Sequence, residues 1–358
     1  MSENPSIMKS LSRVALRPAW LASFLVLAAP TANAEEGAAA SSDTGSQHVA
    51  TAFGEKSRYG HMKPESSLAD LLNHPAFAGH APLLLPWDGR AYDEAMRISE
   101  IGSLLPYHSN VDPDVVVSAL NRMIDDASDG STVFYDIYTP EQKRAVPARA
   151  NTGLFFFRGK PGAPFAVIAP GGGFAYVGSV HEGFPYAAEI SKTGYNAFVL
   201  KYRVGSGGGV ATEDLAVALS YIFRNAGALG VSTAGYSLWG SSAGARMAAS
   251  IGSHGAAAFG GENLPKPSTV VMAYTGHSDM SADEPPTFVV VGERDGIAPP
   301  SAMERRVAAL REAGTEVKYQ KYENLGHGFG PGIGTSADGW IGEAVRFWEK
   351  FITGGSVQ

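Results

Sequence analysis

The sequence predicts an α/β protein in which helices cover both faces of a mostly parallel central sheet. Runs rich in β-branched and aromatic residues alternate with helical patterns along most of the 358 residues. Two of these runs, 165–169 and 197–202, are almost wholly apolar, as strands covered on both faces should be. Hydrophobic residues make up 44% of the chain and charged residues 18%, which is enough apolar surface for a large core. A wholly disordered chain is therefore excluded.

The charge and cysteine counts exclude further classes of protein. The 28 Lys and Arg residues are outnumbered by 35 Asp and Glu residues, and no basic block occurs, so nucleic acid is not expected as a partner. Without cysteine the chain has no disulfide, no thiolate zinc site and no cysteine nucleophile. Because the sequence also has no H-E-x-x-H pattern, we expect no metal and no other cofactor.

The first 34 residues have the three parts of a secretory signal peptide. These parts are a basic stretch with Lys9, Arg13 and Arg17, an apolar run over 19–29, and an A-x-A cleavage site that ends at Ala34. The apolar run is about half of the ~20 residues that a membrane-spanning helix needs. We therefore expect cleavage after Ala34 and a periplasmic or secreted protein without stable membrane insertion. A retained membrane anchor is the alternative.

The rest of the chain is expected to have three parts. Residues 35–66 are predicted to form a flexible linker, because their Ala, Ser and Gly-rich start buries little apolar surface. Residues 67–130 are an N-terminal extension that either packs on the core or acts as a cap. Residues 131–358 are the main domain. We make no prediction of the oligomeric state.

Each predicted element has its own signal. In the extension, Asp112-Pro113 and the apolar stripe that follows predict a helix. The predicted strands are 132–138, 154–157, 165–169, 197–202, 236–239, 269–274, 287–291 and 316–322. The other predicted helices are 213–225, 243–251, 302–313 and 340–351. The glycine-rich segment 205–209 is expected to be a flexible loop, because no phosphate-loop pattern surrounds it.

The segment after strand 236–239 contains the candidate nucleophile, Ser242. Ligands of such sheets bind at the carboxyl ends of the strands. Residues 240–244 read G-S-S-A-G, a G-x-S-x-G pattern between a strand and a helix. Glycines on both sides allow a sharp turn that exposes the serine Oγ, and the Ala243 N–H at the start of the helix can donate to an oxyanion. The alternative is an ordinary turn in which Ser242 only caps the helix.

A serine nucleophile needs an imidazole base that a carboxylate holds in place. His327 follows the last predicted strand between two glycines, and Asp295 follows strand 287–291. His277 is the lesser candidate for the base and a possible pocket residue, and Glu293 and Asp279 are alternative acids. The remaining histidines are interpreted as loop, cap or surface residues: His48, His61, His74, His80, His108, His181 and His254.

Residues 170–174, P-G-G-G-F, follow strand 165–169 and can supply further oxyanion donors. Glycine lets backbone N–H groups approach developing negative charge, and loss of one such donor typically costs ~10²–10³ in rate. We therefore expect Gly172 and Gly173 to act with Ala243. Phe174 is expected to line the pocket. The alternative is a plain glycine-rich turn.

With these motifs in place, residues 132–351 resemble the α/β-hydrolase superfamily, in particular the bacterial esterase and lipase branch that includes acetyl-xylan and feruloyl esterase-like proteins. The likeness is closest from the glycine motif through His181-Glu182-Gly183-Phe184-Pro185 to residues 195–203. The order Ser, Asp, His along the chain is also that of α/β-hydrolases. The resemblance implies the triad Ser242, Asp295 and His327 and oxyanion donors near Gly172, Gly173 and Ala243. It makes Glu182 a support of the oxyanion loop and a possible pocket residue, and a surface carboxylate is the alternative.

The short connection 275–286 leaves no room for a large lid, and the extension is the one obvious candidate for a cap. A site without a lid suits short or bulky polar esters. The expected function is an exported serine hydrolase that cleaves short-chain esters, with acetyl groups on carbohydrate as one candidate substrate, through an acyl-enzyme on Ser242. The alternatives are a serine peptidase of the same fold and a non-catalytic binding protein on a hydrolase scaffold.

Overall fold

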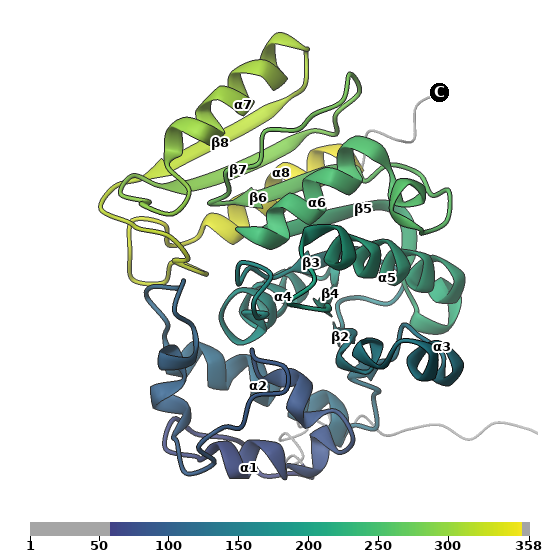
Figure 1. Ribbon diagram of the computed structural model, residues 1–358, viewed down its shortest axis with the longest axis vertical. Helices are drawn as coiled ribbons and strands as arrows, with labels where there is room; N and C mark the ends of the chain where they lie inside the picture. The colour runs from purple at the N-terminus through teal and green to yellow at the C-terminus, as the bar shows by residue number, and fades with distance from the viewer. Residues whose placement is uncertain (1–57, 353–358) are drawn as a thin grey trace, which may run out of the picture. The chain divides into compact units, whose positions relative to one another are not determined.

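A computed structural model describes residues 58–352 (Figure 1). The predicted signal peptide, its cleavage site and most of the predicted linker, 35–66, lie outside the described residues. The end of the linker range is packed against the extension, because Met62 is buried and its N–H donates to Asn121 Oδ1 at 2.8 Å. The packed part of the chain therefore begins before residue 66.

The centre of the structure is an eight-stranded sheet with the order β1-β2-β4-β3-β5-β6-β7-β8. Its strands are β1 (Phe134–Tyr135), β2 (Gly153–Phe157), β3 (Pro164–Ala169), β4 (Asn196–Lys201), β5 (Ser232–Ser241), β6 (Thr269–Ala273), β7 (Thr287–Gly292) and β8 (Val317–Tyr322). Neighbours from β4 to β8 are parallel, whereas β2 runs antiparallel to both β1 and β4. The predicted, mostly parallel sheet is confirmed, although β1 is much shorter than the predicted strand 132–138.

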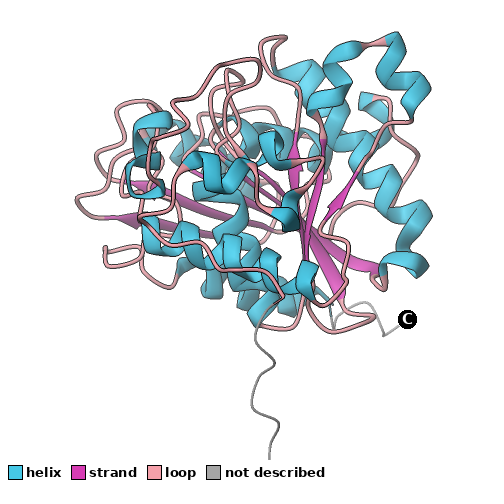
Figure 2. Ribbon diagram, turned by 90° about the horizontal axis from the view of Figure 1, so that it is seen from below, coloured by secondary structure: helices cyan, strands magenta, loops and turns pink. Residues whose placement is uncertain are grey.

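Helices cover both faces of this sheet (Figure 2). One face carries α5 (Gly208–Leu229), α6 (Ala243–His254) and α7 (Pro300–Glu312), and the other carries α4 (Phe184–Lys192) and α8 (Trp340–Ile352). A separate hydrophobic core fills the space on each face, and alternate residues of β2 point into different cores. The prediction of helices on both faces is therefore confirmed.

Two local predictions differ from the structure. The segment 205–209 is not entirely a loop, because Gly208 and Gly209 form the first turn of α5. The structure also contains α4, which was not predicted and which follows a π-helical turn at Ser179–Gly183. Nearly every side of α4 is buried, so its sequence lacks the polar stripe that marks an amphipathic helix.

The N-terminal extension packs on the same face of the sheet as α4 and α8. It contains α1 (Leu68–Leu72), three 3-10 turns and α2 (Pro113–Ser128), and α2 lies against α4. Between the last 3-10 turn and α2, residues 107–109 reach the carboxyl end of the sheet, where they contact the loops described below. Within residues 58–352, no helix is both long enough and apolar enough to span a membrane.

Candidate active site

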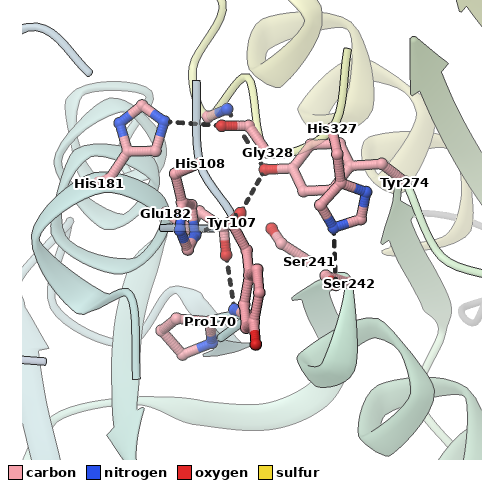
Figure 3. A network of polar contacts seen from close by, with 12 residues as sticks. Tyr107, His108, Pro170, His181, Glu182, Ser241, Ser242, Tyr274, His327 and Gly328 are labelled. Carbon is pink, nitrogen blue, oxygen red and sulfur yellow. Dashed lines mark hydrogen bonds and ion pairs between the residues drawn. The ribbon is translucent and has the colours of Figure 1, made fainter. Parts of the chain in front are cut away.

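The loops after β5, β7 and β8 bring Ser242, Asp295 and His327 together. The Nε2 atom of His327 lies 2.9 Å from Ser242 Oγ, and its Nδ1 atom lies 2.8 Å from Asp295 Oδ2 (Figure 3 shows the pair of His327 and Ser242). The other oxygen of Asp295 accepts the N–H groups of Ile297 at 2.9 Å and Ala298 at 2.7 Å. These bonds fix the carboxylate, which in turn orients the imidazole so that Nε2 can take a proton from Ser242.

The turn that carries Ser242 depends on its two glycines. Ser242 has φ 50° and ψ −113°, a strained conformation for a residue with a side chain. A Cβ on Gly244 would lie 1.8 Å from the Ala169 carbonyl oxygen, and a Cβ on Gly240 would lie 2.4 Å from the backbone of Gly244. The Ser242 side chain makes no capping bond to α6, so the alternative that this serine is only a helix cap does not hold.

Three backbone N–H groups near Ser242 are free to bind an oxyanion. The glycine loop 170–174 passes directly beside Ser242, since a Cβ on Gly171 would lie 3.0 Å from Ser242 Cβ. In the part of the chain that the structure describes, the N–H groups of Gly172, Gly173 and Ala243 have no hydrogen-bond acceptor. Ala243 is the first residue of α6, where no carbonyl of the helix can accept its proton. Gly173 and Ala243 line the same cavity as Ser242, and Gly172 directly precedes Gly173 in the glycine loop.

A cavity of about 320 Å³ opens over Ser242 and His327. Its apolar wall includes Phe174, Ile297 and Pro299, and Arg246 of α6 also lines it. The predicted role of Phe174 as a pocket residue therefore agrees with the structure. A larger hollow of about 680 Å³ lies beside α3 (Pro140–Ala145) and α5 and contains none of these residues.

His277 does not line this cavity, contrary to the prediction. Thr275 and Gly276 line the cavity, whereas the next residue, His277, is not part of the lining and is 6% exposed. Burial, and then the positive charges of Arg306 and Arg246, lower the pKa of His277 to about 4. The ring makes no hydrogen bond with Ser242, so His277 cannot act as the base in this arrangement.

The two alternative acids are also placed elsewhere. Glu293 is exposed and accepts the N–H of Asn324 at 3.2 Å. Asp279 pairs with His254 at 2.7 Å, on the surface. Neither carboxylate contacts His327, which leaves Asp295 as its partner.

Glu182 lies beneath the oxyanion loop and is completely buried, so it is neither a pocket residue nor a surface carboxylate (Figure 3). Its Oε2 accepts the Gly171 N–H at 2.5 Å, and its Oε1 accepts the Tyr274 hydroxyl at 2.7 Å and lies 3.0 Å from His108 Nε2. Burial alone would raise the pKa of Glu182, but the His108 charge and the bonds from His108 and Tyr274 lower it to about 2. The ionised carboxylate therefore holds the backbone of the loop that carries Gly172 and Gly173.

Two of the histidines predicted to be loop, cap or surface residues have buried side chains. His108 does lie in a loop and His181 lies in the π-helical turn Ser179–Gly183, but neither ring is at the surface. The His108 ring, 2% exposed, reaches Glu182 from the extension. The His181 Nε2–H donates to the Gly328 carbonyl at 3.0 Å, and burial lowers the pKa of His181 to about 4. Both histidines therefore support loops of the site from behind.

The extension also contacts the loop of His327 directly. The Ser109 hydroxyl donates to the His327 carbonyl at 2.8 Å, and the Ser109 N–H donates to the Gly328 carbonyl at 3.0 Å. A Cβ on Gly173 would meet the Tyr107 ring at 3.0 Å. Residues 107–109 therefore contact both the loop that carries His327 and the glycine loop 170–174, and none of them lines the cavity.

Backbone strain is concentrated at this site. In the described part of the chain, five residues other than glycine have positive φ, and three of them are Phe174 (59°), Ser242 (50°) and Tyr274 (37°). Each strained residue costs on the order of 1–3 kcal/mol and persists only where its surroundings fix it. Such clusters are typical of functional sites.

The sequence matches no protein-family model and no curated protein. It is similar in structure to an acetyl ester-xyloside bifunctional hydrolase from Caldicellulosiruptor lactoaceticus, with a TM-score of 0.50, 19% identity and coverage of 56% of this chain and 88% of that one. A sugar hydrolase from Lactococcus lactis aligns with a TM-score of 0.50, 20% identity and coverage of 57% and 95%. An α/β hydrolase from a Medee basin deep-sea metagenome library has 23% identity, a TM-score of 0.49 and coverage of 56% and 93%. The sheet order and the strand-turn-helix at Ser242 are those of the α/β-hydrolase fold. The fold class that the sequence predicts is therefore confirmed.

Proposed function

We propose that this protein is a serine hydrolase that cleaves carboxylic esters through an acyl-enzyme on Ser242. The observation that carries the proposal is the hydrogen-bonded chain from Ser242 through His327 to Asp295, beside three unpaired N–H groups. His327 takes the Ser242 proton while Oγ attacks the acyl carbonyl, and the oxyanion binds the N–H groups of Gly172, Gly173 and Ala243. The protonated imidazole then gives its proton to the departing alcohol. Water, deprotonated by the same imidazole, releases the acid.

The volume of the cavity and the lack of a large lid within residues 58–352 favour small or polar substrates. The volume of about 320 Å³ suits a short acyl chain, and no segment of residues 58–352 forms a large lid over the cavity. An open site of this kind also accepts a bulky polar alcohol, so acetyl groups on carbohydrate are candidate substrates. One protein of similar structure is named as an acetyl ester-xyloside hydrolase, which agrees with this class.

The proposed location is the periplasm or the medium. It depends on the signal-peptide pattern of the first 34 residues. Fractionation of cells that express the full chain, with N-terminal sequencing of the product, tests it: a mature protein that begins at Glu35 is expected. Recovery of the uncleaved chain in the cytoplasm would contradict it.

The activity is tested with p-nitrophenyl esters from acetyl to decanoyl, the matching peptide anilides and acetylated xylan. We expect acetyl and propionyl esters to be hydrolysed fastest and Ser242→Ala to lower kcat by up to ~10⁶. Ser241→Ala is the matched control, since the Ser241 hydroxyl is buried and donates to Tyr186 at 3.2 Å. Faster cleavage of the anilides would indicate a peptidase. No turnover of any ester and no reaction with a fluorophosphonate would favour a binding protein.

A further inference from the structure

Arg246 places an uncompensated positive charge in the wall of the proposed active site. It lies on α6, and its N–H is 3.4 Å from the Ser242 carbonyl, so the two residues are one helical turn apart. Its exposed side chain lines the cavity. Among residues 58–352, no carboxylate forms an ion pair or a hydrogen bond with its guanidinium.

No other residue that lines the cavity can neutralise this charge. Apart from His327, Arg246 is the only titratable residue in the lining. Asp295 is buried, and both of its oxygens already accept hydrogen bonds. The nearby carboxylates of Asp279 and Glu284 pair with His254 and Arg306. Within residues 58–352 of a chain whose net charge is −7, Arg246 thus has no acidic partner beside Ser242.

The charge on Arg246 has an effect on its surroundings. After burial and Arg306, Arg246 is the third cause that lowers the pKa of His277 to about 4. At neutral pH the His277 imidazole is therefore uncharged, and Asp279, whose charge also acts on this ring, is paired with His254. A negative group on a bound molecule would meet attraction from Arg246 without repulsion from any carboxylate of the lining.

We propose that the cavity selects esters that also carry a carboxylate, and that Arg246 binds this carboxylate while Ser242 attacks the ester. The inference rests on the proposed function. A guanidinium presents paired N–H donors in one plane, which matches the two oxygens of a carboxylate. Ser242 occupies the N-cap position of α6, four residues before Arg246, and both residues line the same cavity, so a bridge of a few atoms joins the ester carbonyl to the carboxylate. Phe174 and Ile297 provide apolar contact for the carbons of that bridge.

The carboxylate can belong to either side of the ester. On the acyl side, the substrate is a monoester of a dicarboxylic acid. On the alcohol side, it is an acylated hydroxy acid or sugar acid. Both reactions are ordinary hydrolysis, in which water adds across the acyl–oxygen bond to give an acid and an alcohol.

Two pairs of small esters separate these sources. Methyl hydrogen succinate and methyl levulinate differ by a carboxylate oxygen in place of a methyl group on the acyl side. Acetoxyacetate and acetoxyacetone differ in the same way on the alcohol side. For each ester, kcat/KM is measured by pH-stat for the wild type, Arg246→Gln, Arg246→Lys and the control Arg346→Gln, which removes an exposed arginine from α8.

The wild type should prefer the charged member of at least one pair by about tenfold, mainly through KM. Arg246→Gln should remove this preference, Arg246→Lys should keep part of it, and Arg346→Gln should keep it all. Added salt should weaken the preference in the wild type. The pair that shows the preference identifies the side of the ester that carries the carboxylate.

Equal kcat/KM values within both pairs for the wild type, or a preference that survives in Arg246→Gln, would overturn the role of Arg246. Turnover of the neutral esters would in that case still support the proposed esterase. If the wild type hydrolyses none of the four esters and Ser242 does not react with a fluorophosphonate, the proposed function fails, and this inference fails with it.

Discussion

Glu182→Gln tests whether the buried carboxylate positions the oxyanion loop. The side chain receives three donors: the Gly171 N–H, the Tyr274 hydroxyl and His108. A glutamine of the same shape has one oxygen that accepts and one amide group that only donates. At least one buried donor must therefore lose its acceptor, while the volume of the side chain hardly changes.

The size of the effect follows from these contacts. A buried donor without an acceptor costs about 1–3 kcal/mol. If the Gly171 N–H loses its partner, Gly172 and Gly173 move relative to Ser242, and the loss appears in the transition state, where the oxyanion forms. We expect kcat on a short-chain ester to fall about 10- to 100-fold with little change in KM. This is less than the ~10²–10³ that loss of one oxyanion donor costs, because the donors are displaced and not removed.

The matched control is Glu284→Gln, which changes a second buried carboxylate. Glu284 also accepts a backbone N–H, from Ser281 at 2.6 Å, and a hydroxyl, from Ser253 at 2.5 Å, and it pairs with Arg306 at 3.0 Å. Both variants should lower Tm, measured by calorimetry, but only Glu182→Gln should lower kcat strongly. Equal losses of kcat in the two variants, or a Glu182→Gln enzyme within twofold of the wild type, would refute the positioning role.

Three further predictions concern the surroundings of the site. Because the pKa of His181 is about 4 in the folded protein against 6.5 in the unfolded chain, stability is full above pH 6.5 and falls by up to about 3 kcal/mol as the pH drops to 4. Urea unfolding at several pH values should show this slope, and His181→Gln should reduce it without abolishing it, because the pKa of buried His277 is also lowered to about 4; an unchanged slope would contradict the prediction. Gly244→Ala should prevent folding, because its Cβ would lie 1.8 Å from a carbonyl oxygen, whereas Gly227→Ala in α5 has open space and should raise Tm. A folded, active Gly244→Ala protein would show that the turn is not as tight as described. Ser109→Ala should lower kcat about threefold by freeing the His327 carbonyl, and the exposed Ser103→Ala should not; equal rates for the two would argue against this contact.

The residues proposed for the chemistry were predictable because they depend on local chain geometry. The G-x-S-x-G turn needs glycine where a Cβ would meet the backbone, so its sequence records its shape. Asp295 and His327 follow β7 and β8, and parallel strands bring their carboxyl ends to one edge. The positions after the strands therefore indicated all three residues of the proposed triad.

The supporting contacts were not predictable in the same way. Ser109 bonds to His327 across 218 positions of sequence, and His108 reaches Glu182 from an extension with no motif of its own. His181 is adjacent to Glu182 in a segment whose burial depends on its packing against α4 and β4. No periodicity or turn signal marks such long-range contacts, so the sequence did not indicate that His108 and His181 support the site.

The proposed function requires Ser242 to be the nucleophile of a hydrolase. The most direct measurement is the intact mass and peptide map of the protein after reaction with a fluorophosphonate. We expect one adduct per chain on Ser242 and no adduct on Ser241 or in Ser242→Ala. Labelling of His327→Ala should be much slower, because the serine then lacks its base. An adduct on another residue, or no adduct on a folded protein, would contradict it.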